Sequence, residues 1–271
     1  MYLLMDIISL TTINIENGNR NPKLIKERSN LIMKYDPDII LIQESNLGSI
    51  NLDEKYNLIK YEHKKINEVM DIFLKKDSNW MLDSVNHIIS ELGYVKRICK
   101  IISIKNKETN KLLNIANVHL IGGRFEENDK IGKMLIGNIK TIRDRKNEIL
   151  KKIVDQYDVS IIAGDFNSDL NCYLNGGNLQ EQHLNFMKKV SPKKDLEIYK
   201  EWNNAPYKYL KNNSYKLSKN KDTMKVNTSL YNTHPDSVWY KKHLNIKDYK
   251  IINFLEDNLS DHNGIYVKLS V

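Results

Sequence analysis

Acids, amides and histidines follow several apolar runs of this 271-residue chain. The run at residues 159–163 leads through Gly164 into Asp165, Phe166 and Asn167. Asp165 and Asn167 are two residues apart, so an extended backbone would point both side chains to one side. A carboxylate beside an amide can hold a water molecule, because the carboxylate accepts a proton and the amide fixes the orientation of the water. On this stretch alone, an ordinary turn is the simpler interpretation, because glycine, aspartate and asparagine are common in turns.

Similar polar residues stand at the ends of the other apolar runs: Asn14, Glu44, His119, Asp236, Asp261 and His262. A single buried polar residue is usually paired for structural reasons, and a lone histidine such as His119 is more often a core residue than a catalytic one. A whole set is harder to explain by structure, because gathered carboxylates repel one another. A bound cation would relieve that repulsion. The set therefore indicates a metal-assisted site.

The elements that must position these residues alternate between strands and helices. Residues 7–15 are rich in β-branched side chains and read as a strand, residues 23–35 have helical spacing, and residues 38–44 form a second apolar strand. Strand, helix and strand in this order predict a βαβ unit. Its two strands end at the same edge of the sheet, so we expect Asn14 and Glu44 to lie near each other.

The strand–helix–strand pattern recurs in the second half of the chain. Further strands are predicted at residues 56–75, 94–105, 112–120, 159–165, 236–240 and 264–271, with helices at 129–157 and 181–190. Residues 191–232 read as mostly loop. The repetition favours two β-sheets packed face to face with helices outside over a single open sheet. No low-complexity linker divides the chain, so we expect residues 1–271 to form one domain.

Composition restricts the class of protein. The formal net charge is +8, from 42 basic and 34 acidic residues, so the protein should attract polyanions. No apolar run approaches the roughly 20 residues that a membrane-spanning helix needs. Cys99 and Cys172 provide neither a disulfide framework nor a zinc motif, and Asp6 interrupts the apolar start of the chain. We therefore expect an intracellular protein with no signal peptide.

Much of the positive charge lies between residues 188 and 225, where eleven lysines outnumber four acids. Five aromatic residues are interleaved with them: Tyr199, Trp202, Tyr207, Tyr209 and Tyr215. Lysines with aromatic faces between them are typical of sites that hold single-stranded nucleic acid, and we predict substrate contacts for Trp202 and Lys211. The alternative, equally compatible with the sequence, is that the aromatic residues fill a core and the lysines form a solvated face.

Five short motifs stand along the chain in a defined order. They are Asn14 after the first strand, Pro-Asp-Ile-Ile-Leu-Ile-Gln-Glu ending at Glu44, Asn-Val-His-Leu at His119, Gly-Asp-Phe-Asn at Asp165, and Ser-Asp-His ending at His262. In type and order they resemble the motifs of the endonuclease/exonuclease/phosphatase superfamily. That superfamily includes DNase I, exonuclease III-type nucleases, tyrosyl-DNA phosphodiesterases, deadenylases, sphingomyelinases and inositol polyphosphate 5-phosphatases. The resemblance covers the chain from about residue 7 to its end. It implies a four-layer α/β sandwich, with two packed mixed β-sheets flanked by helices, and metal-dependent cleavage of a phosphoester.

The resemblance also implies roles for individual residues. Glu44 would bind Mg²⁺, or Mn²⁺ in its place, with Asn14 and Asp261 close to the ion. Asn14 would also lie beside the substrate. Asp165 would take the proton from the attacking water, and Asn167 would position that water or the phosphate.

Two histidines complete the set that the resemblance implies. His262 would contact the phosphoryl oxygens, and Asp236 would hold it in the required tautomer. His119 would be a second phosphate-contacting histidine. A histidine rather than a tyrosine at this position favours the DNase I, tyrosyl-DNA phosphodiesterase and phosphatase side of the superfamily over the exonuclease III side. Arg124, in a glycine-rich loop, could reach a phosphate or be a surface arginine. The chain departs from the usual pattern just before Asp236, where the expected arginine is replaced by His234.

Taken together, these features predict a Mg²⁺-dependent phosphodiesterase that acts on nucleic acid. DNA is the favoured substrate, and DNA-end processing such as 5′-tyrosyl removal is one form that the activity could take. The basic stretch favours a polyanion over a neutral lipid headgroup, although inositol phosphates are polyanions too. One alternative is a phosphatase or phospholipase of small phosphoesters, of the inositol polyphosphate or sphingomyelinase type. Another is a non-catalytic relative that binds nucleic acid. We expect the protein to act as a monomer.

Overall fold

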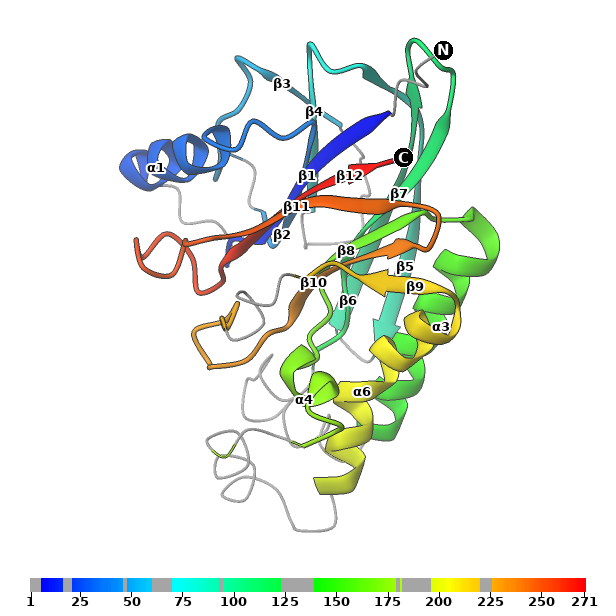
Figure 1. Ribbon diagram of the computed structural model, residues 1–271. Coiled ribbons are helices and arrows are strands. Elements are labelled where there is room, and N and C mark those ends of the chain that lie inside the picture. Colours follow the sequence, from blue (N-terminus) through cyan, green and yellow to red (C-terminus); the bar gives the residue numbers. More distant parts are fainter. Residues whose placement is uncertain are drawn as a thin grey trace.

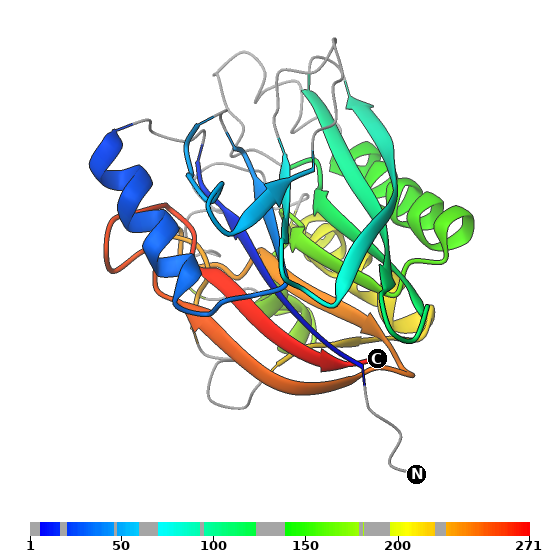
Figure 2. The ribbon, with the colours of Figure 1, turned by 90° about the horizontal axis from the view of Figure 1, so that it is seen from above.

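The computed structural model of the chain describes residues 6–16, 21–45, 48–59, 70–92, 95–122, 139–178, 181, 196–219 and 226–271. These residues form two six-stranded β-sheets that pack face to face, with helices on their outer sides (Figures 1 and 2). The predicted α/β sandwich of two mixed sheets flanked by helices is confirmed. Across these ranges, no helix is both long enough and apolar enough to cross a membrane.

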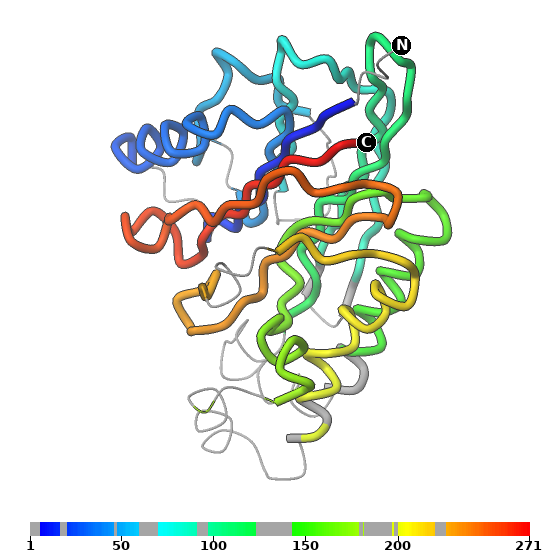
Figure 3. The backbone as a smooth tube through the Cα atoms, viewed as in Figure 1, coloured from blue at the N-terminus to red at the C-terminus, as the bar shows by residue number. Residues whose placement is uncertain are grey.

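Both sheets contain parallel and antiparallel neighbours. The first sheet has the order β11 (Asn245–Ile252), β12 (Gly264–Ser270), β1 (Ile7–Asn14), β2 (Ile39–Gln43), β4 (Asp71–Lys75) and β3 (Tyr56–Leu58). The second has the order β5 (Trp80–Leu92), β6 (Val95–Asn106), β7 (Leu112–His119), β8 (Ile161–Asp165), β10 (Asp236–Lys241) and β9 (Tyr215–Leu217). In the first sheet, β1 runs parallel to β2 and antiparallel to β12, so the first and last strands of the chain lie side by side (Figure 3).

Helices cover the outer sides of the two sheets. They are α1 (Pro22–Met33), α3 (Ile139–Tyr157), the short α4 (Leu170–Leu174) and α6 (Leu196–Asn212). The α1 helix lies beside the first sheet, whereas α3 and α6 pack together beside the second (Figure 2). At the start of α1, the Asn21 side chain accepts a hydrogen bond from the Lys23 amide, and Pro22 fills the first helical position. The predicted βαβ unit of β1, α1 and β2 is therefore present.

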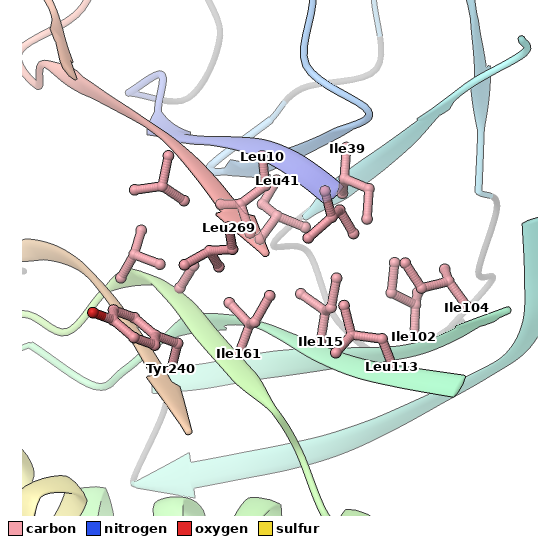
Figure 4. Packing of buried hydrophobic residues seen from close by; sticks show 14 of the residues in the cluster. Leu10, Ile39, Leu41, Ile102, Ile104, Leu113, Ile115, Ile161, Tyr240 and Leu269 are labelled. Carbon is pink, nitrogen blue, oxygen red and sulfur yellow. The ribbon is translucent and has the colours of Figure 1, made fainter. Parts of the chain in front are cut away.

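The main core lies between the two sheets and consists mostly of branched aliphatic side chains, with a few aromatic ones such as Tyr240 (Figure 4). Leu10 and Leu41 come from the first sheet, and Ile115 and Ile161 from the second. Side chains alternate across each strand, so Ile162, the neighbour of Ile161 on β8, instead packs on the helix side of the second sheet. The apolar run that ends at Asp165 is therefore buried on both faces.

The strand pairings bring the polar strand ends to one edge of the sandwich. Asn14 lies opposite Gln43 in the parallel pair of β1 and β2. His119 lies opposite Asp165 in the parallel pair of β7 and β8. The first residue of β10, Asp236, also lies opposite Asp165, because β10 runs antiparallel to β8.

The prediction that residues 191–232 are mostly loop is wrong, because they contain α6 and β9. Pro206 lies inside α6, and the segment is rich in asparagine and lysine, which obscures the helical spacing. Tyr207 and Leu210 are three residues apart and pack in the core between α6 and the second sheet. Tertiary packing stabilises a helix here that local propensity disfavours.

Strand boundaries differ from the prediction in three further places. The strand predicted at residues 56–75 is two antiparallel strands, β3 and β4, and residues 60–69 between them lie outside the described ranges. The sequence reading missed β5 and β11 entirely. Each carries a register shift, after Leu82 and after Ile246 respectively. A bulge interrupts the two-residue alternation by which a strand is recognised.

Two predicted helices fall partly outside the described ranges. Of the helix predicted at residues 129–157, α3 accounts for residues 139–157, and residues 129–138 are not described. Of the helix predicted at residues 181–190, only Glu181 is described.

Candidate active site

A cavity of about 230 Å³ opens at the edge where the polar strand ends meet. Seven residues that the sequence singles out line it: Asn14, Glu44, Asp165, Asn167, Trp202, Asp261 and His262. Asn14 and Asp165 end strands of the two sheets, Trp202 lies on α6, and the other four lie in loops next to strands. The tertiary structure thus brings together side chains that are far apart in the sequence.

Asn14 connects the carboxylates on the two sides of this cavity. Its Nδ2 donates to Glu44 Oε1 at 3.3 Å and to Asp165 Oδ2 at 3.1 Å. Its Oδ1 accepts a hydrogen bond from the Glu16 backbone amide at 3.0 Å. The expected proximity of Asn14 and Glu44 is confirmed. With the amide nitrogen directed at both carboxylates, Asn14 acts as a hydrogen-bond donor between them.

Glu44 reaches the cavity through an unusual backbone conformation. Its φ is +51°, in the left-handed region that non-glycine residues adopt rarely and at a cost of roughly 1–3 kcal/mol. The preceding residue, Gln43, is anchored between the sheets, where its Nε2 donates to Asn117 Oδ1 at 2.6 Å and to Thr12 Oγ1 at 3.0 Å. The chain therefore leaves β2 in a turn that places the Glu44 carboxylate on the cavity wall.

Asp165 and Asn167 form a compact turn after β8. The Asn167 backbone amide donates to Asp165 Oδ1 at 2.6 Å, and Asn167 has a φ of +48°. Its Nδ2 donates to the Leu120 carbonyl at 2.9 Å, which leaves Oδ1 as the amide atom to accept a hydrogen bond from a water or ligand. Burial raises the pKa of Asp165, but His119, His262 and the Asn167 amide outweigh this effect and lower it below its usual value. Asp165 is therefore an anion with one oxygen held by the turn.

Gly164 allows the backbone of β8 to approach β7 closely. A Cβ atom at this position would lie 2.0 Å from the Val118 carbonyl oxygen, and the φ of +140° also disfavours other residues. The glycine of the Gly-Asp-Phe-Asn motif is thus required by the contact between two central strands.

His119 lies behind the cavity wall and does not line the cavity. Its side chain is 1% exposed, and its Nε2 is 3.6 Å from both Glu44 Oε1 and Asp165 Oδ2. In this position it lies between two carboxylates that belong to different sheets. It is placed to orient them more directly than to contact a substrate.

His262 is held by the fully buried carboxylate of Asp236. Its Nδ1 lies 2.8 Å from Asp236 Oδ2, so Nε2 is left to face the cavity. Burial alone would lower the pKa of His262, but the carboxylates of Asp236, Asp165 and Asp261 outweigh it and raise the pKa to about 10. Burial also raises the pKa of Asp236, against the opposing charge of His262. The charges of Asp165 and Asp261 act on the imidazole as well, so the imidazole is the protonated partner of the pair. The pair presents a cationic donor to the cavity.

The acids around the cavity fit a hard divalent cation. The pKa of Asp261 is raised to about 6, chiefly by burial. The positive charge of His262 lowers this pKa, whereas repulsion from Glu16 and Glu44 raises it further. Glu16, Glu44 and Asp261 all line the cavity. Carboxylate oxygens are the ligands that Mg²⁺ and Mn²⁺ prefer, and a bound ion would offset the repulsion between them.

Among the described residues, one group of three side chains could hold a metal ion: Asp165, Asp236 and His262, whose donor atoms lie within 4.8 Å of one another. The buried Oδ1 of Asp236 has no hydrogen-bond partner in the described part of the chain. The hydrogen bond between Asp236 and His262, however, already occupies Nδ1 and one carboxylate oxygen. An ion at this group would have to compete with that bond.

The remaining predicted contacts have different locations. Trp202 lines the cavity but is 3% exposed, whereas Lys211 is exposed at the end of α6 and does not line it. Tyr207 and Tyr215 are buried in the core beside the second sheet, as the alternative reading of the basic stretch expects. Arg124, the side chain of Tyr199 and residues 188–195 and 220–225 lie outside the described part of the chain.

Sequence reasoning missed several further residues that line the cavity, among them Glu16, Arg97 and Tyr231. Tyr231 is 59% exposed at the rim, in the loop before β10. That loop is tied to the Asp261 and His262 segment by a hydrogen bond from the Leu230 amide to the Asp261 carbonyl at 2.8 Å. Nothing local in the sequence marks Arg97, because β6 and the loop reach this edge only when the sheets pack.

Comparison with known proteins connects this fold with one group of structures. No family model matches the sequence, and no curated protein matches it. An endonuclease/exonuclease/phosphatase from Bacteroides vulgatus superimposes with a TM-score of 0.62 at 18% identity, covering 98% of this chain and 99% of that chain. D. rerio TDP2 complexed with a single-strand DNA product superimposes with a TM-score of 0.63 at 14% identity, covering 98% of this chain and 100% of that chain. A mannosyl-6-phosphatase from Bacteroides thetaiotaomicron has a TM-score of 0.60 at 16% identity, covering 97% of this chain and 100% of that chain.

At these identities the likeness shows the fold. The chain has the α/β sandwich of endonuclease/exonuclease/phosphatase proteins over almost its whole length. The resemblance that the five motifs predict is thus confirmed at the level of the fold.

Proposed function

We propose that this protein is a metal-dependent phosphodiesterase that hydrolyses phosphoester bonds in nucleic acid, with DNA as its substrate. One observation carries the proposal: Asp165 with its water-positioning amide and His262 with its buried carboxylate share a cavity with further acids, Glu44 and Asp261 among them. The parts needed for in-line attack on phosphorus therefore lie in one place. A turn or a core contact alone would not require all of them.

Asp165 is the proton acceptor in this mechanism. Its Oδ1 is held by the Asn167 amide and its Oδ2 by Asn14, so the carboxylate is fixed in direction. A water molecule that donates to Asp165 can donate its second hydrogen to Asn167 Oδ1. Proton transfer to Asp165 would then make this water a nucleophile aimed at the phosphorus.

His262 stabilises the negative charge that gathers on the phosphoryl oxygens. With Nδ1 bonded to Asp236, the protonated ring directs its Nε2–H into the cavity. A charge-assisted donor of this kind is worth most in the transition state, where the oxygens carry more charge. His119 would act from behind, by orienting Glu44 and Asp165.

Glu44 and Asp261 would hold the Mg²⁺ or Mn²⁺ ion, with Asn14 beside it. When bound, the ion would neutralise charge on the phosphate and the leaving oxygen. The ion is also consistent with the raised pKa of Asp261, because a cation would restore that carboxylate to its anionic form.

Nucleic acid is favoured over a small phosphoester by two features. The net charge of +8 suits a polyanion, and exposed Tyr231 at the rim offers a face on which a base can stack. TDP2 with a DNA product and the mannosyl-6-phosphatase share this fold, so the fold does not choose between DNA and a sugar phosphate. Cys99 and Cys172 are both buried, which suits action inside a reducing cell. We further propose that the protein acts on DNA as a monomer.

A substrate panel tests the proposal. Single- and double-stranded DNA, RNA, 5′-tyrosyl DNA, mannose 6-phosphate, inositol polyphosphates and sphingomyelin are assayed with Mg²⁺, and Asp165→Asn serves as the inactive blank. We expect turnover of DNA that EDTA abolishes. Turnover restricted to the small phosphoesters would exclude nucleic acid as the substrate. Activity that survives EDTA would exclude the metal, and binding of DNA with no turnover of any substrate would favour a non-catalytic module.

A further inference from the structure

Lys146 occupies a core position on α3. Ile149, Leu150 and Ile153 follow it at intervals of three, four and seven residues, which is the spacing of one helical face, and all three are buried. The Lys146 side chain is itself 0% exposed. An ammonium group is costly to bury unless hydrogen-bond acceptors and other electronegative groups compensate its charge. A lysine in this apolar stripe must therefore have specific partners.

Its partners belong to the turn that follows Asp165. The Lys146 Nζ donates to the Asn167 carbonyl at 2.6 Å and to Ser168 Oγ at 2.8 Å. The same nitrogen lies 4.0 Å from the centroid of the Trp202 ring, which is a cation–π contact. Trp202 therefore presents a ring face to the ammonium group from α6.

Lys146 stands behind the wall of the cavity. Asn167, Ser168 and Trp202 all line the cavity, whereas Lys146 does not. Asn167 is in the left-handed conformation, with its amide bonded to Asp165, its Nδ2 to Leu120 and its carbonyl to Lys146. These three bonds together determine where Asn167 Oδ1 and Asp165 Oδ1 point.

We propose that Lys146 is a positioning residue for the phosphoester site, which clamps the Asn167 carbonyl and the Ser168 hydroxyl and so orients Asp165 and Asn167 toward the attacking water. The predicted effect on kcat rests on the proposed function, whereas the predicted effect on the conformation of the turn after β8 does not. Without the clamp, Asn167 is free to leave the disfavoured φ region. A displacement of about 1 Å in a group that orients a nucleophile can lower the rate about 10²-fold.

Lys146→Met and Lys146→Gln test this role. Methionine keeps most of the apolar stem but removes every donor, whereas glutamine keeps a donor that can reach one of the two oxygens. Ile153→Val, on the same buried face of α3, is the matched control, because it weakens packing without touching the turn. The kcat and KM for bis(p-nitrophenyl) phosphate with Mg²⁺ are measured, together with hydrogen exchange of the Asn167 amide by NMR and thermal unfolding.

We expect Lys146→Met to lower kcat about 10- to 100-fold with KM within about twofold of wild type, since it affects orientation and not binding. Lys146→Gln should recover part of this loss. At equal free energy of unfolding, hydrogen exchange of the Asn167 amide should be at least about tenfold faster in Lys146→Met than in Ile153→Val. If Lys146→Met does not fold, Lys146→Gln carries the same comparison with the control.

Unchanged kcat in a folded variant, or unchanged exchange at Asn167, would overturn the inference. So would an equal loss of kcat in Ile153→Val at matched stability, because the effect would then be one of packing. If the wild-type protein hydrolyses no phosphoester, the proposed function fails by itself. Exchange at Asn167 then still decides whether Lys146 holds the turn.

Discussion

Asn14 of β1 and Asp165 of β8 are joined by a hydrogen bond of 3.1 Å between Nδ2 and Oδ2, although they are 151 residues apart in the sequence. Since β1 belongs to the first sheet and β8 to the second, the bond crosses from one sheet to the other at the cavity. The geometry of the proposed site therefore depends on how the two sheets pack.

Asn14→Asp should impair this junction. The new carboxylate would face Glu44 and Asp165 where a donor stood, so we expect kcat to fall at least about 10²-fold and the free energy of unfolding to fall by about 1–3 kcal/mol. DNA hydrolysis and urea unfolding measure the two effects. Asn57→Asp, on an exposed position of β3, is the control and should leave both unchanged. An active Asn14→Asp protein would mean that the amide donor is dispensable.

Asp165→Asn should remove the proton acceptor while keeping the shape of the side chain. We expect kcat to fall about 10²- to 10⁴-fold with little change in KM, because the base acts in the chemical step. Steady-state kinetics on a DNA substrate measure it, with Asp53→Asn as the exposed control. Turnover near the wild-type rate would remove Asp165 from this role.

Mg²⁺ should stabilise the wild-type protein, because the ion binds only when the acids are gathered by folding. At a concentration of 100 times Kd the gain is about 2.7 kcal/mol, visible as a rise in Tm. Glu44→Gln should lose most of this gain. In EDTA, Glu44→Gln should be at least as stable as the wild-type protein. The substitution removes one of the charges that repel Asp261, and no ion is present to offset that repulsion in the wild type. A Mg²⁺-dependent rise in Tm that is equal in the two proteins would place the ion elsewhere.

Gly164→Ala should be strongly destabilising. Its Cβ would meet the Val118 carbonyl at 2.0 Å, so we expect the free energy of unfolding to fall by about 3 kcal/mol or more. Gly176→Ala separates sterics from backbone strain, because Gly176 also has a positive φ, +68°, but nothing lies within 4 Å of its added Cβ. In the Gly176→Ala control, the free energy of unfolding should fall by only about 1 kcal/mol. Equal losses in urea unfolding would show that the close approach of β7 and β8 is unimportant.

Local patterns in the sequence were sufficient to predict the central strands and the residues at their ends. The runs before Glu44 and Asp165 are continuous and apolar, and the run before Asn14 is rich in β-branched residues. Such runs form strands that are buried on both faces. Parallel pairing then brings their ends to one edge, so the meeting of Asn14 and Glu44 followed from connectivity. The order of the five motifs predicted the fold through the family resemblance that it carries.

The edges of the sheets and the support behind the cavity depended on packing over long distances. The bulged strands β5 and β11 have no clean alternation, and α6 is stabilised by its contacts with α3 and the second sheet. His119 looks like a substrate contact in the sequence, yet the packing of the sheets places it behind Glu44 and Asp165.

The sequence by itself determined which polar residues end the buried strands, since that depends on a few neighbouring side chains. Only the tertiary structure decided which of those residues reach the cavity and which support it from behind. Lys146 illustrates the difference, because a lysine in an apolar helical stripe is visible in the sequence but its partners are not. The physical reason is that the cost of burying its charge is offset by groups from two other segments, the turn after β8 and α6, which meet α3 only when the chain folds.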